Sequence, residues 1–253
     1  MASRFYYRLW MFTRGLFRTI PKIPRYIKYT VLVLMLLAAA DVGRYFFTPE
    51  ISTLIKKPPA KTAFMKHAEK RWDEQDRNKK ITWKWVPISR ISKYAIAAVV
   101  IAEDDKFWGH KGFDLEAMRK ALGHDIIEGR IKFGGSTITQ QLVKNLYLSP
   151  SKNPLRKLKE AVLAWRIERT LTKRRILEIY LNVIEWGDGV YGIEAASRRY
   201  YSKSASMLTP MEAAMLASVI PSPRRYDPLK PGKYLTKRSG QIYAIMKKRG
   251  IVE

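Results

Sequence analysis

The chain has 253 residues, of which 48 are Lys or Arg and 22 are Asp or Glu, so its formal net charge at pH 7 is +26. This length can bury a sizeable core in one large domain or two small ones, and a hydrophobic content of 47% excludes a disordered tail. The sequence contains no cysteine, which excludes disulfides and thiolate metal sites. The basic excess indicates an anionic partner: nucleic acid, an anionic membrane surface or a phosphorylated substrate.

An apolar segment follows the basic N-terminus. Its centre, residues 29–40, reads YTVLVLMLLAAA, and counting from Tyr26 to Phe47 reaches the roughly 20 residues that a membrane-spanning helix needs. Asp41 and Arg44 interrupt the segment, but a spacing of three lets them pair on a helix. We expect an uncleaved anchor. The alternatives are a cleaved signal peptide, because LLAAA offers small residues after a short apolar stretch, and a buried core helix.

The charge distribution predicts the topology and the domain organisation. Many Lys and Arg residues precede the apolar segment, which places the N-terminus in the cytoplasm. Anionic lipid headgroups or a lipid-linked phosphate then fit the charge better than nucleic acid does. We therefore expect a cytoplasmic tail over 1–26, an anchor over 27–47, a proline-containing juxtamembrane linker over 48–80 and a folded domain over 81–253.

The remaining sequence is predominantly helical in pattern. Apolar stripes and capping residues predict helices within residues 89–102, 114–129, 136–148, 155–183 and 209–220. The first can be capped by Ser89 or Ser92, the third by Ser136 or Thr137, and the last by Thr209 in a capping box. In 155–183 we expect Leu158, Val162 and Trp165 on one side, and short β segments are expected near 81–86.

Two short patterns mislead. GDGVYG at 187–192 satisfies the dinucleotide pattern, but it follows a predicted helix rather than a strand, so a turn is the better interpretation. SPSK at 149–152 satisfies the S-x-x-K pattern of penicillin-binding enzymes, yet its prolines break the helix which that pattern needs. The three histidines are not spaced as metal ligands, so no dedicated metal site is expected.

Three features together indicate chemistry on a phosphate leaving group. Glu103 places a carboxylate at a helix end, and a Gly-Gly turn opens a helix that carries Lys144. Arg156 and Glu160 lie at i and i+4 in RKLKE, where the simplest interpretation is a surface ion pair. In combination, however, these residues provide a base, an anion-binding turn and cations.

Five segments carry a resemblance to a known family. The chain resembles the family 51 peptidoglycan glycosyltransferases over residues 80–230, with their five motifs in order: EDDKFWGHKG, GGSTITQQLVKN, RKLKE, RRILEIYLN and RRYYSKSASMLTPMEAAMLASVIPSPRRYDP. The resemblance implies a mainly α fold, with a lysozyme-like helical head and a smaller membrane-facing jaw, beside one N-terminal transmembrane helix.

The activity implied by the resemblance is polymerisation of lipid II into β-1,4 glycan, with inversion at the anomeric carbon and release of undecaprenyl pyrophosphate. The expected partners are lipid II, the growing glycan chain, membrane lipids and other cell-wall synthesis or division proteins, without nucleic acid. The expected location is the bacterial inner membrane, single-pass, with a periplasmic catalytic domain. Apolar residues of 113–133 are expected to help seat the lipid chain at the bilayer.

The resemblance also assigns residues. Glu103 matches the general base and Glu160 the second glutamate, beside the donor pyrophosphate. Asp105 is expected to be exposed. The expected substrate-binding residues are Ser136, Thr137, Gln140, Gln141, Lys144, Asn145, Lys152, Arg156, Lys157 and Lys159. The expected loop-shaping residues are Asp104, Phe107, His110 and Gly112. No cofactor is required by the sequence, although the resemblance allows Mg²⁺ or Mn²⁺ at the substrate pyrophosphate without a protein cage.

Two other function classes compete with this prediction. A lysozyme-like hydrolase or lytic enzyme needs an acid near the scissile bond but no pyrophosphate cations, so Lys144 and Arg156 discriminate against it. A membrane-anchored basic scaffold would use neither glutamate, and Glu103→Gln would then be silent in every catalytic assay.

Overall fold

The computed structural model describes residues 24–120, 135–151 and 153–252. The chain forms two compact units, Met1–Arg44 and Tyr45–Glu253. The second unit holds all the predicted site residues that the structure describes.

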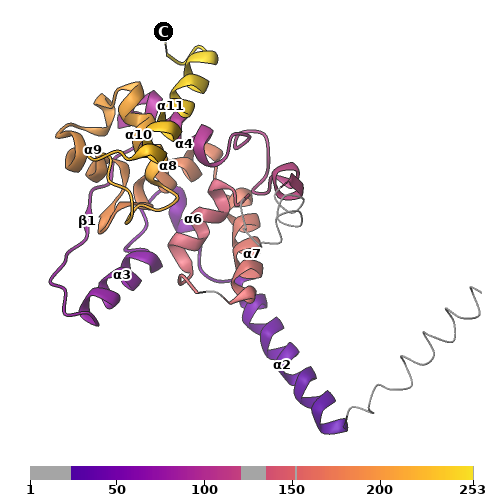
Figure 1. Ribbon diagram of the computed structural model, residues 1–253. Coiled ribbons are helices and arrows are strands. Elements are labelled where there is room, and N and C mark those ends of the chain that lie inside the picture. The colour runs from indigo at the N-terminus through magenta and orange to yellow at the C-terminus, as the bar shows by residue number, and fades with distance from the viewer. Residues whose placement is uncertain (1–23, 121–134, 152, 253) are drawn as a thin grey trace, which may run out of the picture. The chain divides into compact units, whose positions relative to one another are not determined.

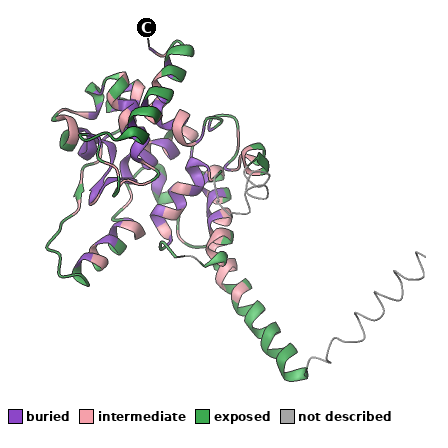
Figure 2. Ribbon diagram, viewed as in Figure 1, coloured by how far each residue is buried: buried purple, intermediate pink, exposed green. Residues whose placement is uncertain are grey.

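The described part of the first unit is one apolar helix, α2 (Arg25–Gly43), and none of its residues is buried (Figure 2). The apolar stretch Arg25–Phe46 has 22 residues and a mean hydropathy of 1.6. At 1.5 Å per residue it is about 33 Å long, close to the hydrocarbon thickness of a bilayer. Arg44 Nη2 lies 3.0 Å from Asp41 Oδ1, as the spacing predicts. A helix without buried residues does not fit the core-helix alternative and is consistent with a membrane anchor.

The second unit is mainly helical, which confirms the predicted fold class (Figure 1). Its α-helices are α3 (Ala63–Asp73), α4 (Lys93–Glu103), α6 (Ile138–Tyr147), α7 (Pro154–Thr170), α8 (Lys173–Val183), α9 (Ile193–Tyr201), α10 (Pro210–Val219) and α11 (Lys233–Lys248). Short 3₁₀ turns cover Ser52–Ile55, Ile88–Arg90 and Ala205–Met207, and a further one, Arg44–Phe46, continues from α2. The strands are β1 (Thr82–Trp83), β2 (Glu185–Gly187) and β3 (Val190–Tyr191).

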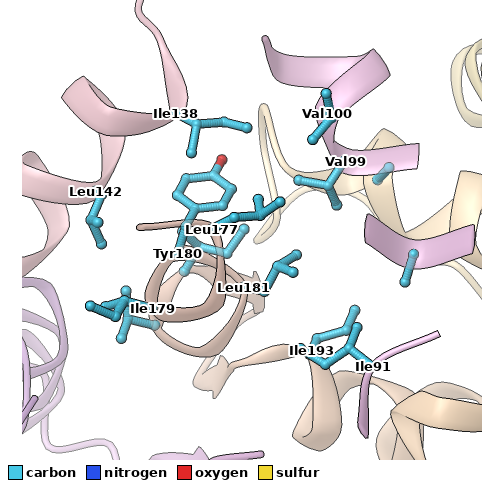
Figure 3. Close-up of a cluster of buried hydrophobic side chains, with 14 of the residues drawn as sticks. Ile91, Val99, Val100, Ile138, Leu142, Leu177, Ile179, Tyr180, Leu181 and Ile193 are labelled. Carbon is cyan, nitrogen blue, oxygen red and sulfur yellow. The ribbon is translucent and has the colours of Figure 1, made fainter. Parts of the chain in front are cut away.

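The core is built around α8, which contributes an unbroken buried run from Ile179 to Val183. Figure 3 shows the ring of Tyr180 rising from α8 among Ile138, Leu142 and Leu177. Helices α6 and α7 pack beside α8, while α10 packs against α4 and α11. Helix α8 therefore gives a rigid base to α6, the helix that carries Gln141 and Lys144.

Capping residues begin three of the helices where the sequence predicts them. Ser92 caps α4, accepting a hydrogen bond from the Tyr94 N–H. Thr137 with Gln140, and Thr209 with Glu212, form complete capping boxes at α6 and α10. Such caps satisfy N–H groups that have no partner within the helix. They fix the first residue of each helix, and through it the phase of the side chains that follow.

The predicted helical segment 155–183 forms two helices, which meet at Leu171 and Thr172. Thr172 caps α8, and Pro154 lies in the first turn of α7. Leu158 and Trp165, which were expected on one side of this segment, are 55% and 46% exposed. Helix α7 carries a second apolar stripe that faces the core instead: Leu163, Ala164 and Ile167.

Several elements had no prediction. Helices α9 and α11 lie outside the predicted ranges, and the predicted linker 48–80 contains α3, whose Met65, Ala68 and Trp72 pack on Tyr191 in a small second cluster. The prolines at 49, 58 and 59 indicated a linker, so this packing was not predicted. In the predicted helix 114–129, residues 115–120 are helical and the rest lies outside the described residues.

A three-stranded sheet in the order β1-β3-β2 covers the GDGVYG segment. Strand β3 pairs in parallel with β1 and antiparallel with β2, so the segment is a hairpin and no βαβ unit follows. Gly192 has φ of 81°, and a Cβ there would lie 2.7 Å from the Asn182 carbonyl oxygen, so the close approach of α9 to α8 requires glycine.

Candidate active site

Glu103 is the last residue of α4 and is half-buried. Gln141 Nε2, from α6, donates a hydrogen bond of 2.7 Å to Glu103 Oε2. Burial raises the pKa of Glu103, and the nearby charge of Asp104 adds to this, against the hydrogen bond from Gln141 and the positive charges of Arg238 and Lys144. A carboxylate with a raised pKa is a better proton acceptor than an exposed one, which suits a general base.

Asp104 connects Glu103 to the loop that follows it. Its Oδ2 accepts a 2.9 Å hydrogen bond from the Ile138 N–H at the start of α6, and its Oδ1 lies 2.8 Å from His110 Nε2. His110 Nδ1 accepts from the Gly112 N–H, so Nε2 carries the proton and donates to Asp104. Phe107 is fully buried beneath this loop. The buried acid thus joins the end of α4 to the beginning of α6 and holds Glu103 beside Gln141.

Asp105, the third acid of this stretch, and Gly112 have distinct environments. Asp105 is exposed and accepts two hydrogen bonds from Arg249, at 2.6 and 2.8 Å. Gly112 has φ of 89°, and a Cβ there would lie 3.0 Å from Glu168 Cγ. Its carbonyl accepts a 2.7 Å hydrogen bond from Thr137 Oγ1, which ties the loop to the cap of α6.

A cation that the sequence did not predict lies beside Glu103. Arg238, on α11, donates to the Ala102 carbonyl at 2.9 Å, and its charge lowers the pKa of Glu103. Leu235, Ile242 and Met246 are the buried apolar residues of α11, at positions spaced by seven and four. That periodicity was the signal that could have predicted α11.

Arg238→Met should shift the acid limb of the activity profile to higher pH. Removing the cation favours the protonated carboxyl, so the base form of Glu103 is lost at a higher pH, by about 1 unit or less. The measurement is kcat against pH for wild type and variant. Arg249→Met, which removes the cation that pairs with Asp105 instead, should leave the limb in place. An unchanged limb in Arg238→Met would contradict the electrostatic account.

A second cluster lies at the N-terminal half of α7. Glu160 is 2% exposed and forms ion pairs with Arg156 and with Lys157, whose Nζ lies 2.8 Å from Glu160 Oε2. Lys157 Nζ also donates to Ser136 Oγ at 2.8 Å. The ion pair is therefore not the surface pair that spacing alone suggests, because its carboxylate is buried and holds two cations in place.

Lys144 lies between two cavities. It lines a cleft of about 580 Å³ together with Gln141, Asn145 and residues 220–225, and a smaller cavity of about 200 Å³ together with Ser136, Arg156, Lys157 and Glu160. Burial lowers the pKa of Lys144, while the charge of Glu160 opposes this. Because α6 carries Gln141 three residues before Lys144, one helix face presents both the partner of Glu103 and a cation of the smaller cavity.

Comparison with known proteins agrees with these features. The family model described as Transglycosylase matches residues 69–247. A biosynthetic peptidoglycan transglycosylase of Methylobacillus flagellatus is 43% identical over 215 residues, which cover 85% of this chain and 94% of that protein. The chain belongs to the peptidoglycan transglycosylase family. Proteins with the same name from Thiobacillus denitrificans and Nitrosospira multiformis are 51% and 45% identical over 68% and 74% of this chain, and 75% and 82% of their own lengths.

Membership in the transglycosylase family makes the chain a glycosyltransferase, so the alternative of a non-enzymatic scaffold is wrong. The mainly helical second unit fits the lysozyme-like fold of this family, and the apolar α2 is consistent with a membrane anchor.

The transglycosylase structure separates the predicted substrate-binding residues into groups. Ser136, Gln141, Lys144, Asn145, Arg156 and Lys157 line the two cavities. Thr137 and Gln140 are buried and form the capping box of α6, and Thr137 also lines a third cavity together with Glu103 and Ser136. Lys159 Nζ lies over the Tyr45 ring, 5.4 Å from its centroid, outside the residues that line the smaller cavity. Lys152 lies outside the described residues.

Three further features of the transglycosylase site had no prediction. Tyr180 donates a hydrogen bond to Gln141 Oε1 at 2.8 Å. Arg224 Nε lies 3.0 Å from both oxygens of Glu185 at the wall of the larger cleft, and α3 contributes Phe64 to the same cleft. Among residues 24–120, 135–151 and 153–252, no three His, Cys, Asp or Glu side chains gather as a metal site.

Proposed function

We propose that this protein polymerises lipid II into linear β-1,4 glycan strands of peptidoglycan and releases undecaprenyl pyrophosphate. The printed names of its relatives support peptidoglycan as the product class. The observation that carries the proposal is the position of Lys144: it lines a cavity with Arg156, Lys157 and Glu160, and it lies one helical turn after Gln141, the partner of Glu103. One face of α6 thus contacts the base through Gln141 and presents Lys144 to the cavity that the other cations line.

In this proposal Glu103 accepts the proton of the acceptor 4-hydroxyl as the sugar oxygen attacks the donor anomeric carbon. A sugar hydroxyl is a weak nucleophile, so a positioned base contributes about 10²–10⁴ in rate. The new bond forms on the face opposite the departing pyrophosphate, which inverts the anomeric centre. The raised pKa of Glu103 supports this role, since the carboxylate can take up and later release a proton in a moderate pH range.

Lys144, Arg156 and Lys157 stabilise the negative charge that develops on the pyrophosphate as the bond to the sugar breaks. Fixed cations in a half-buried site are more effective than water because they need no reorganisation. Glu160 holds Arg156 and Lys157 in position, and its negative charge offsets the repulsion between these two cations. A Mg²⁺ or Mn²⁺ ion on the pyrophosphate would use phosphate oxygens as its main ligands.

We also propose that residues 1–26 are cytoplasmic, that the apolar segment spans the inner membrane and that the catalytic unit is periplasmic. The Lys and Arg residues before α2 support this orientation. The apolar segment ends at two aromatic residues, Phe46 and Phe47, which are 50% and 82% exposed. Exposed aromatic residues at the end of a membrane-spanning segment are typical of an interfacial aromatic belt.

The full-length protein in detergent should convert purified lipid II into glycan polymer and undecaprenyl pyrophosphate. Gel separation of labelled glycan measures chain growth, and muramidase digestion of the product tests the β-1,4 linkage. A hydrolase or lytic enzyme would shorten preformed glycan and leave lipid II unchanged. That result would overturn the proposed reaction while leaving the fold and the family intact.

A further inference from the structure

Tyr180 places a polar group inside the apolar core. Its side chain is fully buried among Ile138, Leu142 and Leu177, and Figure 3 shows the hydroxyl oxygen at the end of the ring that points away from α8. A buried hydroxyl without a partner is costly, so its position needs an explanation. The hydroxyl donates to Gln141 Oε1 at 2.8 Å. The hydrogen bond from Tyr180 to Gln141 thus links the apolar core to the active site.

The Gln141 amide has a defined orientation because of its neighbours. Its Nε2 donates to Glu103 Oε2 at 2.7 Å and approaches the Ser136 carbonyl at 3.4 Å, so the amide nitrogen faces two acceptors. Its Oε1 accepts a hydrogen bond from the Tyr180 hydroxyl. Turning the amide over would place an oxygen against an ionised carboxylate and a carbonyl, and would leave the Tyr180 hydroxyl facing an N–H group.

Gln141 is, among the described residues, the hydrogen-bond partner of the Glu103 carboxylate, and it occupies Oε2. The arrangement leaves Oε1 to meet a substrate hydroxyl. We propose that Tyr180 is a positioning residue: its buried hydroxyl fixes the Gln141 amide, and the amide fixes the Glu103 carboxylate toward the acceptor. This inference rests on the proposed role of Glu103 as general base.

A positioning role predicts more than a loss of stability. Without the Tyr180 hydroxyl, the Gln141 amide can turn and its hydrogen bond to Glu103 weakens. That hydrogen bond favours the ionised carboxylate, so its loss favours the protonated form and moves the acid limb to higher pH. The burial of Tyr180 and the charge of Glu103 both raise the pKa of the phenol, so the proton stays on Tyr180 throughout this range.

The test is Tyr180→Phe in the full-length protein, which keeps the ring and removes one oxygen. We expect kcat for lipid II polymerisation to fall roughly tenfold, with KM nearly unchanged and the acid limb at higher pH. The matched control is Tyr191→Phe, because Tyr191 is also fully buried and its hydroxyl has no hydrogen-bond partner in the described part of the chain. Its kcat and pH profile should equal those of the wild type.

A double-mutant cycle separates positioning from structure. Gln141→Ala changes a half-buried side chain outside the core and should reproduce the shifted acid limb. If Tyr180 acts through Gln141, adding Tyr180→Phe to Gln141→Ala should cause no further loss of kcat. Additive losses, or a wild-type profile in Tyr180→Phe, would overturn the inference. Activity that survives in Glu103→Gln would instead overturn the base assignment, so the two failures are distinguishable.

Discussion

Replacing Glu103 with Gln should lower kcat for glycan polymerisation by about 10²–10⁴-fold, the contribution expected of a positioned general base. The amide is close in size to the carboxylate but cannot accept the proton of the acceptor hydroxyl. It also places a second amide against Gln141, whose Nε2 now donates to the carboxylate at 2.7 Å. KM for lipid II should change little, because the donor cations are untouched. Initial rates of polymer formation over a range of lipid II concentrations give both constants.

Asp105→Asn is the matched control for Glu103→Gln. It neutralises a carboxylate two positions along the same stretch, but that carboxylate is exposed and pairs with Arg249. Losing such a pair costs at most about 1 kcal/mol of folding free energy, so activity should stay at the wild-type level. Equal losses in both variants would point to a general effect of charge on this loop. Full activity in Glu103→Gln would remove the base assignment.

The position of Glu103 could be predicted because local signals agree around it. Ser92 caps α4, the apolar stripe of Ile91, Ala95 and Val99 sets its phase, and the helix ends at Glu103. The direction of the pKa shift of Glu103 could not be predicted. Burial raises this pKa and the charge of Arg238 lowers it, and Arg238 is 135 positions away in the sequence. Tertiary packing decides such balances, and periodicity carries no information about them.

Helix α7 shows why the predicted cation set needed the structure. Its sequence presents apolar residues on two sides, so the pattern left open which side is buried. The structure buries Leu163, Ala164 and Ile167, which carries Glu160 inward with them and leaves Trp165 half exposed. Arg156 and Lys157 follow Glu160 to the cavity, whereas Lys159 turns to the Tyr45 ring. Three basic residues of one segment that look equivalent in sequence therefore differ in environment.

Lys144→Met should reduce kcat by about 10²–10³-fold, the loss typical of removing one preorganised electrostatic stabiliser. Methionine keeps most of the aliphatic packing of the half-buried side chain and removes its charge. The difference in kcat between wild type and variant should be greatest at neutral pH, where the lysine is protonated. It should be smaller at high pH, where kcat of the wild type itself falls. That decline should begin below the usual range for lysine, because burial lowers the pKa of Lys144. Polymerisation rates from pH 6 to about 10 measure it.

Lys159→Met supplies the comparison that decides whether position or total charge matters. It removes the same charge from the same basic region, but from a side chain over the Tyr45 ring rather than one lining the cavity with Arg156 and Glu160. If the cavity is the pyrophosphate site, Lys159→Met should keep kcat within about threefold of wild type, as expected for a partly exposed cation–π contact. Equal losses of kcat in the two variants would show that both lysines stabilise the leaving group. The family resemblance would then have predicted the cation set better than the cavity geometry does. A silent Lys144→Met would place the leaving group outside this cavity, because no fixed cation that stabilises a departing pyrophosphate can be removed without slowing its departure.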